Sequence, residues 1–248
     1  MARSSLILVL LAGCDSVFGL VDDPKPCQPA SFDGMTPTTL AVADEFSVDW
    51  DQRFAVISMD GLMYEMELPA GELVAIDLGV YMDLGLSLSP EGDALFYTAQ
   101  IEPVLLRGAL RTAAARWTLD ATVPRGSYAG TPSGDAFGPR HVLVRLRTND
   151  ADVIEYEDRD GVWMPVGDLH PVPGQRAPNL SPNGLVMVYA AQDALGEHAI
   201  YAATRASRDE WFGNPQKILT GEYSQPQLLG KCHNLYVDDG ALLQRFDR

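Results

Sequence analysis

The strongest constraint on the fold of this chain is a segment that occurs twice. Leu180 to Gln192 reads LSPNGLVMVYAAQ and Leu88 to Gln100 reads LSPEGDALFYTAQ, with seven of thirteen positions identical at a spacing of 92 residues. Self-similarity at a fixed period is the sequence signature of a repeat architecture. The pair therefore has two interpretations: a duplicated binding motif, or the mark of a fold built from repeated units.

Further repeats at half this spacing favour the second interpretation. Midway between the two copies the chain reads TPSGDAF at 131–137, a degraded form of the same turn and strand. Three tryptophans, Trp117, Trp163 and Trp211, follow one another at spacings of 46 and 48 residues. Extending the spacing in both directions predicts five units that begin near residues 40, 84, 127, 176 and 224.

Each unit contains short apolar runs separated by turn residues. Asp-Gly pairs at 60–61, 160–161 and 239–240 join apolar runs, as in hairpins whose turn needs a positive φ. A period of about 40–50 residues with several short strands predicts an all-β fold, a β-propeller of about five, or six, four-stranded blades over residues 39–248. A β-sandwich is the alternative, but it explains the strands and not the spacing.

The segment Ala109 to Trp117 is the one that favours a helix by residue propensity. Its Arg111 and Trp117 match Arg205 and Trp211 in the later copy, both at an offset of 94 residues, and Ile200-Tyr201 there is typical of a strand. We therefore predict a strand followed by a loop in both places.

The clearest unit resembles a known family. Its Leu180-Ser-Pro-Asn-Gly184 turn, the strand at 200–204 and the Trp211-Phe-Gly-Asn-Pro215 segment resemble a blade of TolB-type, WD-repeat-like propellers, which commonly carry Ser-Pro-Asp-Gly at this turn. Here Asn183 and Glu91 replace the Asp, and only two of the five units keep Ser-Pro. The resemblance implies a propeller of the bacterial envelope. Tyr97 and Tyr189 occupy matching places after the turn and are expected to pack between blades.

The N-terminus is typical of an export signal. One cation, Arg3, precedes the apolar run Leu6 to Leu11, which is too short to span a bilayer. The following Leu11-Ala-Gly-Cys14 resembles the bacterial lipoprotein signal, which implies cleavage before Cys14 and a diacyl lipid on that cysteine. We expect residues 1–13 to be a lipoprotein signal peptide and the proline-rich residues 14–38 to be a tether. A buried cysteine in an ordinary signal peptide is the alternative.

Lipidation at Cys14 would place the protein in the bacterial cell envelope, anchored to the inner or the outer membrane and facing the periplasm or the cell surface. In that oxidising space Cys27 and Cys232 are natural disulfide partners, with two free thiols as the alternative. Propellers commonly close their ring with an N-terminal strand, and the last unit here is too short for a fourth strand. A strand from Phe32 to Val42 would complete it and bring Cys27 towards Cys232.

Composition excludes some partners. The net charge is −16, and removal of a signal peptide that contains Arg3 makes it −16 − 1 = −17, which disfavours nucleic acid. The histidines are dispersed, and no nucleophile elbow, phosphate loop or zinc-protease motif is present in the sequence. We therefore assign no catalytic residue, no metal ligand and no cofactor, and leave the ligand-binding residues undetermined. The histidines are His141, His170, His198 and His233.

The function expected from these features is that of a monomeric, non-enzymatic lipoprotein whose propeller binds another envelope protein or a small ligand, and which contacts the membrane through its lipid anchor. One alternative is an enzyme of the glycoside hydrolase or lyase type with acidic residues in the central channel, and another is a structural or surface-display protein. Carboxylates from several blades that converge in a deep polar pocket would favour the enzyme.

Overall fold

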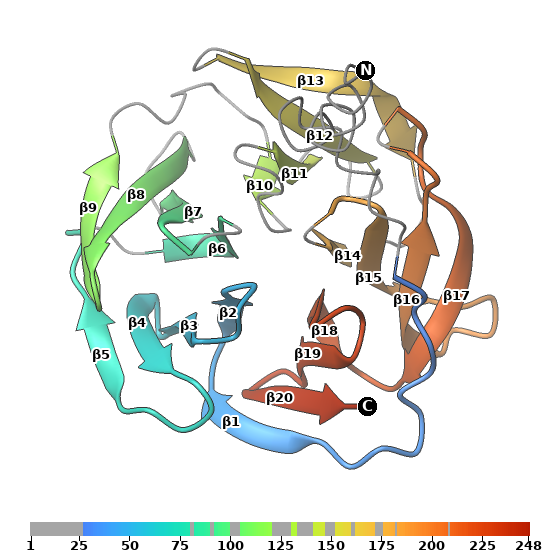
Figure 1. The fold of residues 1–248 in the computed structure, drawn as a ribbon, viewed down its shortest axis with the longest axis horizontal. Coiled ribbons are helices and arrows are strands. Elements are labelled where there is room, and N and C mark those ends of the chain that lie inside the picture. The colour runs from blue at the N-terminus through green and yellow to red at the C-terminus, as the bar shows by residue number, and fades with distance from the viewer. Residues whose placement is uncertain are drawn as a thin grey trace, which may run out of the picture.

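The strands form five four-stranded antiparallel sheets around a common centre (Figure 1). The computed structural model describes residues 27–79, 82–89, 92–99, 105–120, 130–132, 141–146, 152–159, 162–171, 176–181, 183–207 and 209–248. In this part of the chain no helix is long and apolar enough to cross a membrane. The architecture is all-β and propeller-type, as the repeat spacing predicts.

The sheets are numbered here in chain order. Sheet 1 contains β2 (Glu45–Val48), β3 (Phe54–Met59), β4 (Leu62–Glu67) and β5 (Leu73–Ile76). Sheet 2 contains β6 (Met82–Leu88), β7 (Ala94–Ala99), β8 (Leu105–Ala113) and β9 (Arg116–Asp120). Sheet 3 contains β10 (Gly130–Pro132), β11 (His141–Leu146), β12 (Asp152–Arg159) and β13 (Val162–Pro171). Sheet 4 contains β14 (Arg176–Leu180), β15 (Val186–Gln192), β16 (His198–Thr204) and β17 (Gly213–Thr220). Sheet 5 contains β18 (Ser224–Leu229), β19 (Asn234–Asp238), β20 (Leu242–Asp247) and β1 (Thr38–Val42).

Sheet 5 joins the two ends of the folded chain. β1 pairs antiparallel with β20, with Thr38 opposite Arg245 and Val42 opposite Leu242. β1 lies within the segment from Phe32 to Val42, which the sequence predicts to complete the last unit. The first strand of each unit is the innermost, and neighbouring sheets touch in turn: β2 contacts β6, β6 contacts β10, β11 contacts β14, β14 contacts β18 and β18 contacts β2.

Side chains on the innermost strands link neighbouring sheets. The Gln227 side-chain amide of β18 donates to the Val48 carbonyl of β2 at 2.7 Å and accepts from the Val48 N–H at 2.8 Å. On β2, Ser47 Oγ accepts from the Leu88 N–H of β6 at 3.0 Å. Gln227 and Ser47 occupy equivalent registers, as do Val48 and Leu88. The side chain at this strand position, Gln227 in β18 and Ser47 in β2, thus bonds the backbone of the next sheet. It does so at two successive junctions, between sheets 5 and 1 and between sheets 1 and 2.

The core also lies between sheets. One buried cluster combines Phe54 and Val56 of sheet 1 with Leu95, Tyr97 and Trp117 of sheet 2. Tyr97 is fully buried in this cluster. Its packing therefore bridges two sheets, as expected for a residue repeated between blades.

Tyr189, the matching residue of sheet 4, has a different main contact. Its ring stacks on Tyr201 of its own sheet, with centroids 5.7 Å apart. The buried cluster around it also receives Trp50 from sheet 1. The repeated tyrosine thus serves the core in both copies, through different neighbours.

The duplicated segment builds the same turn in both copies. Ser181 N–H donates to the Val186 carbonyl at 2.8 Å, and the Val186 N–H donates back to Ser181 Oγ at 3.0 Å. Ser89 and Ala94 make the same pair of bonds, at 2.8 Å and 2.9 Å. Gly92 and Gly184 both have a φ of 70°, a conformation that favours glycine. The repeat is explained by backbone geometry.

Sheet 1 makes this turn with other residues. Asp49 stands in the place of the serine, and its carboxylate accepts from the Phe54 N–H at 2.8 Å and the Arg53 N–H at 2.6 Å. Gln52, with a φ of 57°, stands in the place of the glycine. The geometry is kept although no residue of the Ser-Pro-x-Gly pattern remains.

The local predictions have mixed outcomes. Positive φ values of 52° and 74° at Asp60 and Gly61 close the β3–β4 hairpin, and Gly240, with a φ of 97°, lies between β19 and β20. Residues 160–161 lie outside the described residues, but the strands on either side pair as a hairpin. The strand expected at Ala109 is β8, whereas the loop expected to include Trp117 is wrong. A tight turn at Ala115, with a φ of 51°, returns the chain into β9.

Trp117 belongs to β9 because its indole has a partner in sheet 1. Its Nε1–H donates to the Glu65 carboxylate at 3.0 Å, and the Ala115 N–H donates to the same carboxylate at 2.9 Å. The Arg111 guanidinium pairs with Glu65 at 2.5 Å and lies over the Phe54 ring at 4.0 Å. This buried network joins sheets 1 and 2 and has a structural role.

Candidate functional site

A cleft opens at the junction of sheets 4 and 5. It has a volume of about 330 Å³ and is lined by the end of β15, the start of β16, the segment between β17 and β18, and the β19–β20 turn. The lining residues are Ala190, Ala191, Gln192, His198, Glu222, Tyr223, Ser224, Asp239 and Gly240.

The apolar wall of the cleft is fixed by the core. Ala190 is buried on the face of β15 that packs towards sheet 5, and its small side chain leaves space that a larger residue would fill. The Tyr223 ring packs edge-to-face on Phe246, with centroids 5.8 Å apart. Because Phe246 belongs to the core between sheets 4 and 5, this wall is rigidly supported.

Three polar side chains meet at one edge of the cleft. His198 Nε2 lies 2.6 Å from Gln192 Nε2 and 3.5 Å from Glu222 Oε2. Gln192 and His198 face each other in the β15–β16 ladder, which sets their spacing. The Glu222 side chain is 81% exposed, so its carboxylate is available to a ligand.

A buried carboxyl lies directly beside the cleft. Asp238 ends β19, and its carboxylate accepts from the Gly240 N–H at 2.7 Å and the Ser224 hydroxyl at 3.0 Å. Burial raises the pKa of Asp238 above its ordinary value, against the opposing effect of these two hydrogen bonds. The negative charges of Asp239 and Asp44 raise this pKa further. The carboxyl orders the β19–β20 turn in a region of negative potential.

None of the described residues that line the cleft is Lys or Arg. Lys217 of β17 pairs instead with Asp193 at 3.2 Å and lies 3.9 Å from Glu197. The hydrogen bond to Asp193 raises the pKa of Lys217. Backbone N–H groups of Glu197 and Leu195, with Lys217, lower the pKa of Asp193.

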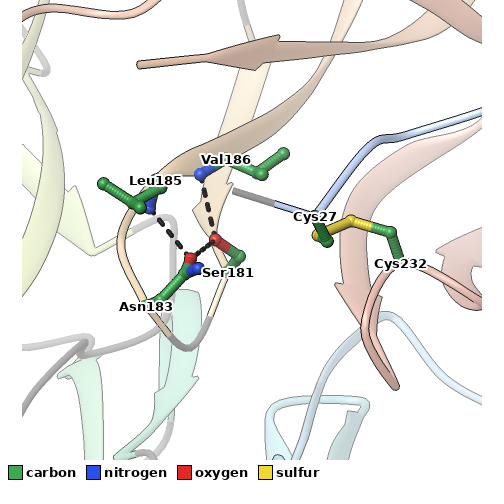
Figure 2. Close-up of a disulfide and its surroundings, with 6 residues drawn as sticks. All are labelled: Cys27, Ser181, Asn183, Leu185, Val186 and Cys232. Atoms are coloured by element: carbon green, nitrogen blue, oxygen red, sulfur yellow. Dashed lines mark hydrogen bonds between the residues drawn. A yellow bond between two sulfur atoms is a disulfide. The ribbon is translucent and has the colours of Figure 1, made fainter. Parts of the chain in front are cut away.

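The two cysteines expected to pair are joined in the structure. The Cys27–Cys232 disulfide links Cα atoms 5.9 Å apart across 205 residues of sequence (Figure 2). Cys232 has a φ of 68° in the β18–β19 turn, the register that Gly92 and Gly184 occupy in sheets 2 and 4. Cys27 packs against the buried cluster that contains Val186, which places the disulfide near the duplicated turn of sheet 4.

The disulfide and the cleft lie at opposite ends of sheet 5. Ser224 pairs with Asp238 at the cleft end of β18 and β19, whereas Leu229 pairs with Asn234 at the other end, beside Cys232. The first described residue, Cys27, is therefore attached at the end away from the cleft.

The residues after Cys27 pack into the junction of sheets 4 and 5. Phe32 is fully buried there, and its N–H donates to the Ile218 carbonyl at 2.6 Å. The Asp33 carboxylate accepts from the Thr220 N–H at 2.8 Å. Residues 27–37, which the sequence assigns to the tether, thus contact the sheets. The expected signal peptide, residues 1–13, and the expected lipid-bearing Cys14 lie outside the described residues.

The cleft was not identified from the sequence. Of its polar residues, Gln192 was noted as the end of the duplicated segment, His198 among the histidines and Asp239 in a hairpin turn, and none was connected with the others. His141 and His170 lie on β11 and β13, while His233 lies in the turn beside Cys232. Across the described ranges, no group of three or more His, Cys, Asp or Glu residues is arranged to hold a metal ion.

Comparison with known proteins supports the fold. No family model matches the chain, and no curated protein matches it. Among solved structures, a putative TolB from Agrobacterium tumefaciens has a TM-score of 0.51 at 14% identity, covering 79% of this chain and 71% of that one. TolB from Acinetobacter baumannii has a TM-score of 0.50 at 12% identity, covering 97% and 68%. A putative oxidoreductase (glucose dehydrogenase) from Thermus thermophilus has a TM-score of 0.50 at 10% identity, covering 86% and 99%.

These similarities define a class of fold. The chain has a propeller-type fold like that of TolB. At these identities the likeness concerns the arrangement of the strands alone, because one propeller fold carries both binding proteins and enzymes.

Proposed function

We propose that this protein is a lipid-anchored protein of the bacterial cell envelope whose propeller binds a protein or small ligand in the cleft between sheets 4 and 5. The cleft itself carries the proposal, because it combines a rigid apolar wall with an exposed carboxylate, an imidazole and an amide. Concave sites with a mainly apolar lining and a few convergent polar groups are the usual form of a ligand pocket.

The five sheets act as blades of one closed ring in this proposal. The successive contacts of the innermost strands, which end with β18 against β2, support closure. The two hydrogen bonds between Gln227 and the Val48 backbone support it further, because they join the last sheet to the first.

The positions of the expected lipid anchor and of the cleft favour one orientation of the protein relative to the membrane. The Leu11-Ala-Gly-Cys14 signal would place the lipid thirteen positions before Cys27 of the disulfide, with the twelve residues 15–26 as the connecting tether. Because the disulfide lies at the end of sheet 5 away from the cleft, the cleft would open away from the membrane, towards soluble or peripheral partners. The high negative charge also disfavours adsorption of the domain to anionic lipids.

Binding is favoured here over glycoside hydrolase or lyase chemistry. Among the described residues, the carboxylates that line the cleft are those of Glu222 and Asp239, and both come from connections at the junction of sheets 4 and 5 rather than from several blades. The buried Asp238 has hydrogen bonds from Gly240 and Ser224 to its two oxygens, so its role is to hold the turn. This arrangement differs from the convergent carboxylates expected of such an enzyme.

The test is affinity capture of the lipidated protein from its native envelope, combined with lipid labelling. We expect an alkyne-palmitate label on the wild type that is lost in Cys14→Ala, together with a shift of the protein to the soluble fraction. Gln192→Trp should block the cleft and remove the captured partner, whereas Glu72→Trp, an exposed change outside the cleft, should retain it. Label on Cys14→Ala would reject the anchor, and equal capture by both tryptophan variants would reject the cleft.

A further inference from the structure

We propose that the cleft between sheets 4 and 5 recognises a primary ammonium group on a short alkyl stem. This inference rests on the proposed function, since it names the chemistry of the ligand that the cleft would bind. The stem would lie along Ala190 and Tyr223, and the ammonium would lie at the carboxylates of Glu222 and Asp239.

The charge of the cleft points to a cation. Its ionisable carboxylates are exposed at Glu222 and Asp239, and none of its lining residues is Lys or Arg. Lys217 of the neighbouring β17 is already paired with Asp193 at 3.2 Å, and the His198 imidazole lies 3.5 Å from Glu222 Oε2. A ligand cation would therefore meet carboxylates that Lys217 does not neutralise.

The surroundings add to the negative potential. Asp44 lies close enough to Asp238 for their charges to interact, and one Asp44 oxygen accepts from the Asp60 N–H at 2.7 Å. Burial is the main cause of the raised pKa of Asp238, and the negative charges of Asp239 and Asp44 add to it. A cation bound near Asp239 would lie in the negative potential of these carboxylates.

The hydrogen bonds already made favour an ammonium over a guanidinium. Asp239 Oδ1 accepts from the Leu242 N–H at 3.0 Å, and its Oδ2 accepts from the Gln244 side-chain amide. Both oxygens are therefore partly occupied, which disfavours the paired hydrogen bonds of a guanidinium fork. A compact ammonium with three rotatable donors needs only a single free lone pair on a carboxylate.

The shape of the cleft accommodates the stem. Ala190 leaves space on the face of β15 that packs towards sheet 5, and the Tyr223 ring packs edge-to-face on Phe246 at the same junction. Long amine side chains bury their methylene groups on such surfaces while the charged end stays in water. Two sources carry this chemistry: a lysine side chain of a partner protein, and a free diamine.

The test is calorimetric titration of the full-length lipidated protein in neutral detergent. The probes are N-α-acetyl-lysine amide for the side chain, 1,4-diaminobutane for the free amine, and the N-ε-acetylated lysine amide as the neutral control. We expect one or both amines to bind and the neutral control not to bind. Preference between the two amines identifies the source. Binding of neither, or equal binding of the neutral control, overturns the inference.

Variants locate the binding site. Glu222→Gln and Asp239→Asn should each weaken amine binding about two- to five-fold, the range of exposed ion pairs, and Glu72→Gln, which removes the same charge elsewhere, should leave it unchanged. Equal weakening by all three would show a general charge effect and overturn the site. Matched melting temperatures exclude unfolding. If the amines fail while Gln192→Trp still removes the envelope partner, the ligand class is wrong and the proposed function stands.

Discussion

The disulfide permits a quantitative prediction about how the N-terminal segment is held. Replacement of Cys27 by Ser removes a cross-link between residues 205 positions apart. In the chain-entropy model, closing a loop of this length lowers the entropy of the unfolded chain by about 18 cal/mol/K, which is worth about 5 kcal/mol at 25 °C. We therefore expect the free energy of unfolding to fall by up to about 5 kcal/mol in Cys27→Ser.

The assay is equilibrium unfolding in guanidinium chloride, followed by tryptophan fluorescence. The wild type in reducing agent should match Cys27→Ser, and reducing agent should leave Cys27→Ser unchanged. A thiol count on the denatured mature protein should rise by two on reduction, because the remaining cysteine, Cys14, is expected to carry lipid through its sulfur. An unchanged count, or a variant as stable as the oxidised wild type, would refute the reasoning.

Four further outcomes follow from the described contacts. Phe32→Ala should lower the free energy of unfolding by about 3–5 kcal/mol, because it empties a fully buried site between sheets 4 and 5; a loss under about 1 kcal/mol in chemical denaturation would contradict that packing. Gln227→Leu should cost about 2–4 kcal/mol in the same assay, because it leaves both backbone groups of Val48 without their partner, and an unchanged midpoint would reject the link between sheets 5 and 1. Asp238→Asn should be more stable than the wild type at neutral pH, because the raised pKa makes the ionised form costly; melting curves should converge as the pH falls below the ordinary Asp pKa, where the wild-type carboxyl is protonated in both states. Asp193→Asn, whose parent carboxyl has a lowered pKa, should show the opposite sign at neutral pH, and the same sign in both variants would contradict the assignment.

The spacing of the repeats was sufficient to predict the repeated sheets, because each sheet packs between two sheets of similar structure. Ser89 and Ser181 remain recognisable since the same hydroxyl accepts the same N–H group in both sheets. The equivalent turn at Asp49 could not be recognised from the sequence as a copy of the Ser-Pro-x-Gly turn. It depends on a side-chain acceptor and a positive φ, and the carboxylate of Asp49 with the backbone of Gln52 supplies both.

The cleft could not be predicted in this way. Glu222 and Asp239 lie in connections that differ between units, and their meeting with the strand residues Gln192 and His198 depends on how sheets 4 and 5 pack. Gln192 and His198 are neighbours through a strand ladder, but Glu222 and Asp239 reach them only after the chain has completed the ring. The sequence also did not indicate that residues 27–37 contact the sheets, because Phe32 and Ile218, which make this contact, are separated by most of the sequence.

The most direct test of the account is site-specific photo-cross-linking in intact cells. A photoreactive residue in place of Glu222 samples the cleft, and one in place of Lys231 samples the opposite end of sheet 5 beside Cys232. The account predicts a discrete adduct at position 222 that is competed by the ligand, and none of that mass at position 231. The same adduct at both positions, or an adduct at 231 alone, would contradict the claim that the cleft is the binding site.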